Sequence, residues 1–224
     1  MLGTAKQNLE TSPALHTRAS AYLCFARLFR EAPTPALLQQ LREHGVLAHV
    51  EDAQWFNQAE AIAVEYARLF AVPGEHAVQP YESAYCDTLT IDTSTACSSY
   101  FASEPPPTGL TGFLYGPSAV AVCNAYRRAG FELDPARHVL PDHLAIELEF
   151  MGRLLGRGEC EAAKVFFSEH LGRWVCRCLE DMRQRTATGF YRVVADAAGA
   201  FLQQEQRLFL DPELEHAYSR AKGR

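Results

Sequence analysis

Along most of the chain, apolar residues recur at alternating steps of three and four, which is the spacing of one face of an α-helix. Runs such as Leu15, Ala19, Tyr22, Ala26 and Phe29 follow this spacing closely. Six runs of this kind predict helices with apolar faces over residues 15–29, 56–70, 119–129, 144–155, 167–178 and 190–208. The pattern predicts an all-α protein, built as a multi-helix bundle.

Proline and glycine mark where several of these helices begin and end. The helix over 144–155 is predicted to begin at Pro141, a residue suited to the first helical position, with Asp142 in its first turn. Gly130 is predicted to end the preceding helix, and Asp211 to cap a last short helix after Pro212. The best strand candidate, residues 88–95, is short and isolated.

The irregular part of the chain is residues 96–116, which are rich in Ser, Thr, Pro and Gly. A loop of this length in a compact domain is usually functional or a hinge. It separates an N-terminal helical part, residues 1–95, from a C-terminal helical bundle, residues 117–224. We expect the two parts to form one integrated domain.

Composition and charge narrow the class of protein. The chain has 224 residues, 48% of them hydrophobic, which is enough for a packed core. A net charge of −6 opposes nonspecific nucleic-acid binding and suits a basic partner. The seven cysteines contain no CxxC pair and are interpreted as reduced and mostly buried, which favours the cytosol. No signal peptide is recognisable, and Pro and Gly interrupt the uncharged stretch 105–126, so we expect a soluble cytoplasmic protein.

The sharpest local feature is the segment 141–151, which contains Asp142, His143 and Glu147. His143 and Glu147 are four residues apart and share a helix face. These side chains could lie at the mouth of a groove and face a cationic ligand. The alternative is a helix cap followed by an exposed pair contributing about 0.3 kcal/mol, and the residues alone favour this alternative.

The second feature is a helix end followed by a proline turn that carries two tyrosines. Aromatic residues beside such a turn can form a shallow apolar groove for a peptide. Ordinary core packing of a helix end explains the same residues. The residues concerned are Tyr66, Leu69, Phe70, Pro80, Tyr81, Glu82, Ser83 and Tyr85.

Catalysis finds little support in the sequence. His138, His143 and Glu147 could belong to a small metal-dependent hydrolase, but the spacing supplies fewer ligands than such sites use. No nucleophile elbow and no phosphate-binding glycine motif is present. A helical scaffolding or regulatory protein is a further alternative. We therefore expect no cofactor, no metal and no enzymatic activity.

Five motifs in order resemble the TorD/DmsD family of redox-enzyme maturation chaperones. They are Tyr66-x-x-Leu69-Phe70, Pro80-Tyr81-Glu82-Ser83-x-Tyr85, Tyr126-x-x-x-Gly130-Phe131, the segment 141–151, and Phe166-x-x-x-His170-Leu171-x-x-Trp174. The resemblance covers roughly residues 15 to 210. It implies an all-helical fold and a chaperone, monomeric or dimeric by helix exchange.

The resemblance also implies a ligand: the twin-arginine leader peptide of a molybdopterin oxidoreductase, bound with the apo form of that enzyme before export. Asp142 and His143 match the signature pair associated with leader binding, and Tyr66, Leu69, Pro80 and Tyr81 match positions on the same surface. The resemblance therefore favours a role in binding for Asp142 and His143 over the role of a helix cap. The predicted peptide-binding residues are Tyr66, Leu69, Phe70, Pro80, Tyr81, Glu82, Ser83, Tyr85, Asp142, His143 and Glu147. The segment 96–116 is longer and richer in proline than in compact members.

Overall fold

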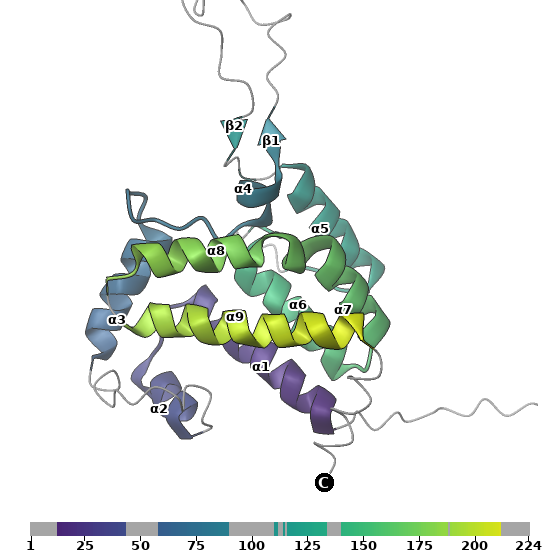
Figure 1. The fold of residues 1–224 in the computed structure, drawn as a ribbon, viewed down its shortest axis with the longest axis horizontal. Coiled ribbons are helices and arrows are strands. Elements are labelled where there is room, and N and C mark those ends of the chain that lie inside the picture. The colour runs from purple at the N-terminus through teal and green to yellow at the C-terminus, as the bar shows by residue number, and fades with distance from the viewer. Residues whose placement is uncertain are drawn as a thin grey trace, which may run out of the picture.

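The structure is a computed structural model that describes residues 13–43, 58–89, 110–111, 114, 116–133, 140–187 and 189–211. Most of these residues are helical (Figure 1), which confirms the predicted all-α class. The helices are α1 (Pro13–Arg30), α2 (Pro35–Glu43), α3 (Ala59–Tyr66), α4 (Glu82–Cys86), α5 (Pro117–Arg128), α6 (Leu144–Gly156), α7 (Cys160–Phe166), α8 (Gly172–Arg185) and α9 (Gly189–Leu210). Two π-helical turns, η2 (Ala67–Ala71) and η4 (Phe167–Leu171), continue α3 and join α7 to α8.

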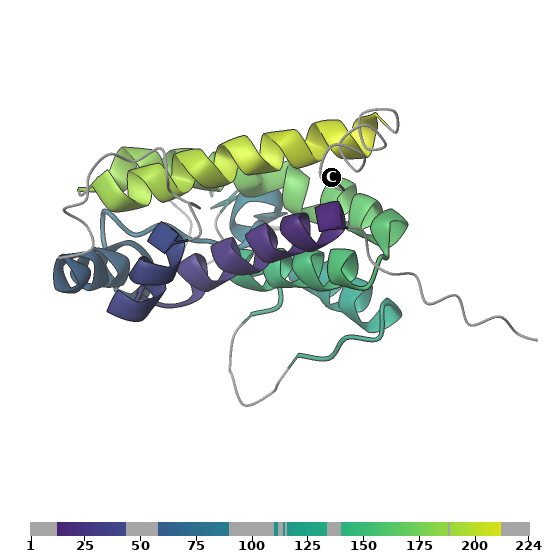
Figure 2. The same cartoon turned by 90° about the horizontal axis from the view of Figure 1, so that it is seen from below.

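The long helices form two packed layers. Helices α8 and α9 lie side by side across the front of the molecule (Figure 1), and α1 packs against α6 beneath them (Figure 2). Large side chains from both halves of the sequence, including Tyr22, Trp174 and Tyr191, are fully buried between these layers. The core therefore combines elements that are far apart along the chain.

Most of the predicted helices are confirmed, and their ends follow ordinary capping chemistry. Helix α1 ends at Arg30, before Pro33, as expected. Helix α5 has proline in its first turn and is followed by Gly130, whose φ of 71° lies in the left-handed region that glycine adopts without strain. Of the face predicted over 190–208, Phe190, Val194 and Leu208 are buried in α9, and Ala197 and Phe201 are partly buried against the core.

The start of α6 and two short helices were predicted wrongly. Pro141 and Asp142 form a turn before α6, and His143 is the N-cap, so Asp142 is not in the first turn of the helix. Helices α2 and α4 were not predicted, because they have only 9 and 5 residues, too few for an apolar face to repeat over several turns.

The strand prediction is partly corrected. β1 (Thr88–Leu89) is not isolated: it pairs antiparallel with β2 (Leu110–Thr111), opposite Thr111 and Leu110. Phe56, residues 90–95, most of the segment 96–116, and residues 212–224 with the predicted last helix lie outside the described residues. The division into residues 1–95 and 117–224 stays a prediction.

The π-helical turn η4 changes which side chains face the core. A π turn holds one residue more than an α turn, and such turns are frequent at functional sites. His170 and Leu171, adjacent in sequence, are both buried there. Gly172 permits the close return of the chain, since a Cβ at this position would lie 2.7 Å from the carbonyl oxygen of Phe167.

Two further observations concern the cysteines and the membrane. The six cysteines in the described ranges are free thiols, and Cys176 is exposed while Cys178 is buried, as their spacing within a helix requires. No helix in the described part of the chain is both long enough and apolar enough to cross a membrane.

Candidate functional site

The two segments singled out in the sequence meet in the structure. The backbone of Tyr81 pairs antiparallel with that of His143. The N–H of Glu82 donates to the carbonyl of Asp142 at 2.9 Å, and the N–H of Leu144 donates to the carbonyl of Pro80 at 2.8 Å. The entry to α4 and the entry to α6 are thus held together by the main chain.

Asp142 stabilises α4 from a position 59 residues along the chain. Its Oδ2 accepts a hydrogen bond from the N–H of Ser83, one of the first-turn donors of α4, at 2.9 Å. The Asp142 side chain is completely buried. The expectation that Asp142 lies at the mouth of a groove is therefore wrong, and the side chain instead fixes the start of α4.

His143 caps α6 and is held in its neutral form. Its Nδ1 accepts a hydrogen bond from the N–H of Ala145 at 3.0 Å, which an imidazolium could not do. Burial, together with the nearby charge of Arg30, lowers the pKa of His143 to about 4. The ring meets that of Tyr81 edge-on with centroids 5.1 Å apart. His143 thus presents an uncharged, partly buried ring beside Tyr81.

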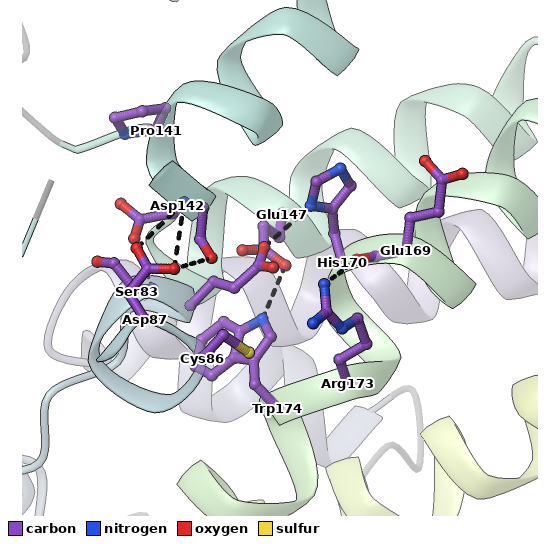
Figure 3. Close-up of polar contacts among 12 residues, drawn as sticks. Ser83, Cys86, Asp87, Pro141, Asp142, Glu147, Glu169, His170, Arg173 and Trp174 are labelled. Atoms are coloured by element: carbon purple, nitrogen blue, oxygen red, sulfur yellow. Dashed lines mark hydrogen bonds and ion pairs between the residues drawn. The ribbon is translucent and has the colours of Figure 1, made fainter. Parts of the chain in front are cut away.

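Two more carboxyl groups lie beneath these segments. Oε2 of Glu147 accepts from Nε1 of Trp174 at 3.1 Å, and Oε2 of Glu82 lies 3.1 Å from Nδ1 of His170 (Figure 3). Both carboxyl groups are buried, so the exposed helix pair considered for His143 and Glu147 is wrong. Burial, followed by the neighbouring carboxyl of Glu82, raises the pKa of Glu147 well above its usual value.

Five of the predicted residues remain partly accessible, and four of them form two ring contacts. We call Tyr66, Phe70, Tyr81 and His143 the aromatic surface. The rings of Tyr66 and Phe70 lie 5.3 Å apart, and the hydroxyl of Tyr81 is close enough to raise the pKa of Tyr66, after burial and the charge of Glu31. The Tyr66–Phe70 ring pair, from the end of α3 and from η2, thus lies near the Tyr81–His143 ring pair, from the loop before α4 and the N-cap of α6.

The other predicted residues lie behind or beside this patch. Leu69, Pro80 and Ser83 are buried, as are the three acids described above. Tyr85 lies across α4, where its ring stacks on Trp174 at 5.6 Å and its hydroxyl donates to Asp181 at 2.9 Å. Tyr85 belongs to the contact between α4 and α8.

Charged residues at the edge of the aromatic surface were not found from the sequence. Arg30 forms an ion pair with Glu149, and its carbonyl accepts a hydrogen bond from the Tyr66 hydroxyl at 2.6 Å. Glu31, exposed, pairs loosely with Arg27 at 3.4 Å. No motif links Arg30 to Glu149, which is 119 positions away, so only the fold reveals this contact.

The geometry of the described residues does not support a metal site. In the ranges that the structure covers, no group of three or more His, Cys, Asp or Glu side chains could hold a metal ion. His138 lies outside these ranges. Nδ1 of His143 and Oε2 of Glu147 are already engaged in hydrogen bonds that maintain the fold.

Comparison with known proteins identifies the family. The fold and site together define an all-helical protein with a half-buried aromatic surface supported by buried acids. A family model described as the nitrate reductase delta subunit matches residues 47–180. The chain belongs to this family, which confirms the resemblance to the TorD/DmsD-like chaperones. Its general role is that of a redox-enzyme maturation chaperone.

A solved structure is also similar to this chain. It is a candidate redox enzyme maturation protein from Archaeoglobus fulgidus, with a TM-score of 0.48 and 20% identical residues. The match covers 84% of this chain and 93% of the other.

Proposed function

We propose that this protein is a cytoplasmic chaperone that binds the twin-arginine leader and the apo form of a molybdopterin oxidoreductase, and that it has no catalytic activity of its own. Binding delays export until the cofactor has been inserted. Family membership supports the chaperone role. The observation that carries the proposal is the edge-on contact of Tyr81 and His143, two partly accessible rings on a rigid backbone pairing.

The aromatic surface suits the apolar stretch of a leader. Tyr66, Phe70 and Tyr81 offer large, rigid apolar area at little cost in conformational entropy. His143 is neutral, and Arg30 is paired with Glu149, which it shares with Arg153. Exposed Glu31 is available to the leader arginines at the edge.

The buried acids support this surface from behind. Asp142 fixes the first turn of α4, and the residue before α4 is Tyr81. Asp142 is therefore proposed as a positioning residue, in place of the direct partner of a leader arginine that the sequence suggested. Glu82 and Glu147 hold α4 and α6 against His170 and Trp174.

Calorimetric titration with a synthetic leader tests the binding site. The peptide carries an Arg-Arg pair and an apolar stretch of roughly ten residues, and a matched peptide has Gln-Gln in place of the arginines. Tyr81→Ala should weaken binding by about 1–3 kcal/mol, as for aromatic residues at the centre of an interface. Val165→Ala, on exposed α7, is the control and should bind as wild type. Wild-type affinity for Tyr81→Ala would remove the aromatic surface from the site.

Two substitutions of Asp142 separate charge from position. Asp142→Asn retains an oxygen that accepts from the N–H of Ser83, whereas Asp142→Ala leaves that donor unsatisfied. As a positioning residue, Asp142 should tolerate Asn and lose leader affinity with Ala. A loss of about 1–3 kcal/mol already with Asn would instead indicate a direct pair with a leader arginine. Thermal unfolding of both variants shows whether the fold persists.

The proposal leaves two oligomeric forms open, a monomer and a dimer formed by helix exchange, as the family resemblance implies. The residues of the aromatic surface come from α3, η2 and the entries to α4 and α6 of one chain.

A further inference from the structure

A second concave site lies on the other side of the buried acids, between α5 and the junction of η4 with α8. It is an open pocket of about 440 Å³. Its lining residues are Ala121, Asn124, Arg128, Glu169, His170 and Arg173. None of the residues predicted for leader binding lines it, so the pocket is a site distinct from the aromatic surface.

Two guanidinium groups, of Arg128 and Arg173, make the pocket positively charged. Arg173 donates to the backbone carbonyl of Glu169 at 3.2 Å (Figure 3), and within the described ranges neither Arg173 nor Arg128 lies within ion-pair distance of a carboxylate. Both guanidinium groups line one pocket, together with a single carboxylate, Glu169. Arginine forks match the geometry of an oxyanion.

The remaining polar groups of the pocket include one donor group, on Asn124, and one acceptor group, on Glu169. The side-chain oxygen of Asn124 accepts from Arg127 at 3.2 Å, which orients its NH₂ group as a donor. Nδ1 of His170 faces Glu82 at 3.1 Å, which leaves Nε2 on the opposite side of a ring that lines the pocket. Glu169 adds an acceptor.

The balance of charge selects among oxyanions. Two guanidinium groups and one carboxylate leave a single excess positive charge, which suits one carboxylate better than a polyphosphate. A peptide with an acidic residue supplies a carboxylate, and its backbone N–H groups can donate hydrogen bonds to the carboxylate of Glu169. We propose that this pocket receives an acidic side chain of the client enzyme, as a second contact separate from the leader.

The two contacts are linked through α4. His170 lines the pocket and lies against Glu82 at the start of α4, and Tyr81 of the aromatic surface immediately precedes Glu82. A client that occupied both sites at once would gain avidity. That the acidic side chain belongs to the client enzyme rests on the proposed function. That the pocket binds a carboxylate does not.

The test is an NMR titration of the full chain with blocked peptides. The probe is acetyl-Gly-Glu-Gly-amide, which carries one carboxylate, compared with acetyl-Gly-Gln-Gly-amide and with inorganic phosphate. Side-chain signals of Arg173 and His170 report on the pocket. The Glu peptide should shift these signals saturably, and the Gln peptide should not. Phosphate at the same concentration should not compete.

Variants connect the signal to the pocket. Arg128→Gln should weaken binding of the Glu peptide roughly tenfold, since it removes one charge-assisted pair. Arg128 has no described contact to lose, so the fold should persist. Arg192→Gln, on the exposed face of α9, is the matched control and should bind as wild type. The twin-arginine leader should bind Arg128→Gln normally.

Three results would overturn the proposal. They are equal shifts with the Gln peptide, stronger binding of phosphate than of the Glu peptide, and full affinity of Arg128→Gln. A leader peptide that binds normally alongside any of these would refute the second contact alone. Failure of the leader to bind wild type would refute the proposed function and leave the pocket result standing.

Discussion

Two regions of the interior bury charged side chains, and they do so in opposite ways. Between α1 and α9, Arg18 and Glu205 are 2% and 1% exposed and form two hydrogen bonds, at 2.8 and 3.0 Å. Beneath α4, the carboxyl groups of Glu82, Asp142 and Glu147 gather with no described Arg or Lys within ion-pair distance. The first region contains a pair of opposite charges, whereas the second contains three carboxyl groups and one histidine, His170, beside Glu82.

The difference separates a structural contact from a region that supports a site. The Arg18–Glu205 pair, with the guanidinium over the ring of Phe209 at 5.1 Å, fixes how α9 lies on α1. The acids beneath α4 instead share their hydrogen bonds with a helix N-terminus, an indole and an imidazole. One oxygen of each acid has no partner among the described residues unless a proton is shared. Such a region orients the segments above it but adds little net stability.

The largest effect is expected from breaking the compensated pair. Glu205→Ala leaves the Arg18 charge buried without its carboxylate and should lower the free energy of unfolding by about 3–5 kcal/mol. Urea unfolding followed by circular dichroism measures the change. The double variant Arg18→Met with Glu205→Leu buries no charge and should recover most of the loss. If the double variant were as unstable as Glu205→Ala, shape rather than charge would govern this contact.

A smaller effect is expected from pH, through His143. Its pKa in the folded state is about 4, below the ordinary value of 6.5, so the unfolded chain binds the extra proton first. The stability contributed by neutral His143 is present above pH 6.5 and is lost as the pH falls toward 4, by about 3 kcal/mol at most. Asn is a good N-cap that does not titrate, so His143→Asn should flatten this part of the pH profile. Parallel profiles for wild type and variant would contradict the prediction.

The smallest effect is expected at Glu147. Its raised pKa means that the folded state holds the proton, so its contribution to stability declines as the pH rises above 4.5. Glu147→Gln retains an acceptor for Trp174 and supplies a donor toward Glu82. The variant should lie within about 1 kcal/mol of wild type at pH 5 and become the more stable protein at pH 8. Denaturant unfolding at both values measures this, and a large loss at pH 8 would show that Glu147 is ionised.

The sequence predicted the long helices because their buried faces repeat over several turns. It predicted the start of α6 wrongly, because Pro141 is typical of a first turn, whereas His143 is not a preferred cap. Helix α2 could have been found: Thr34 accepts from the N–H of Leu37 at 3.2 Å, and Thr34-Pro35 is a recognisable start.

The candidate site was predicted in part. The tyrosines and His143 were singled out from motifs, and the structure brings most of them together. The burial of Asp142 could not be predicted, because its partner is the first turn of a five-residue helix elsewhere in the chain. Contacts between distant residues depend on the packing of α4, α6 and α8, which periodicity does not determine.

The π-helical turn η4, which joins α7 to α8, determines how α8 is rotated about its axis relative to α7. An α-helix rotates by about 100° per residue, so removing the additional residue of η4 would turn α8 by that angle relative to α7. Trp174 would then point away from Glu147, and Arg173 away from His170 and Asn124. Deleting any single residue within 167–171 should therefore destabilise the protein far more than replacing the side chain of that residue with alanine.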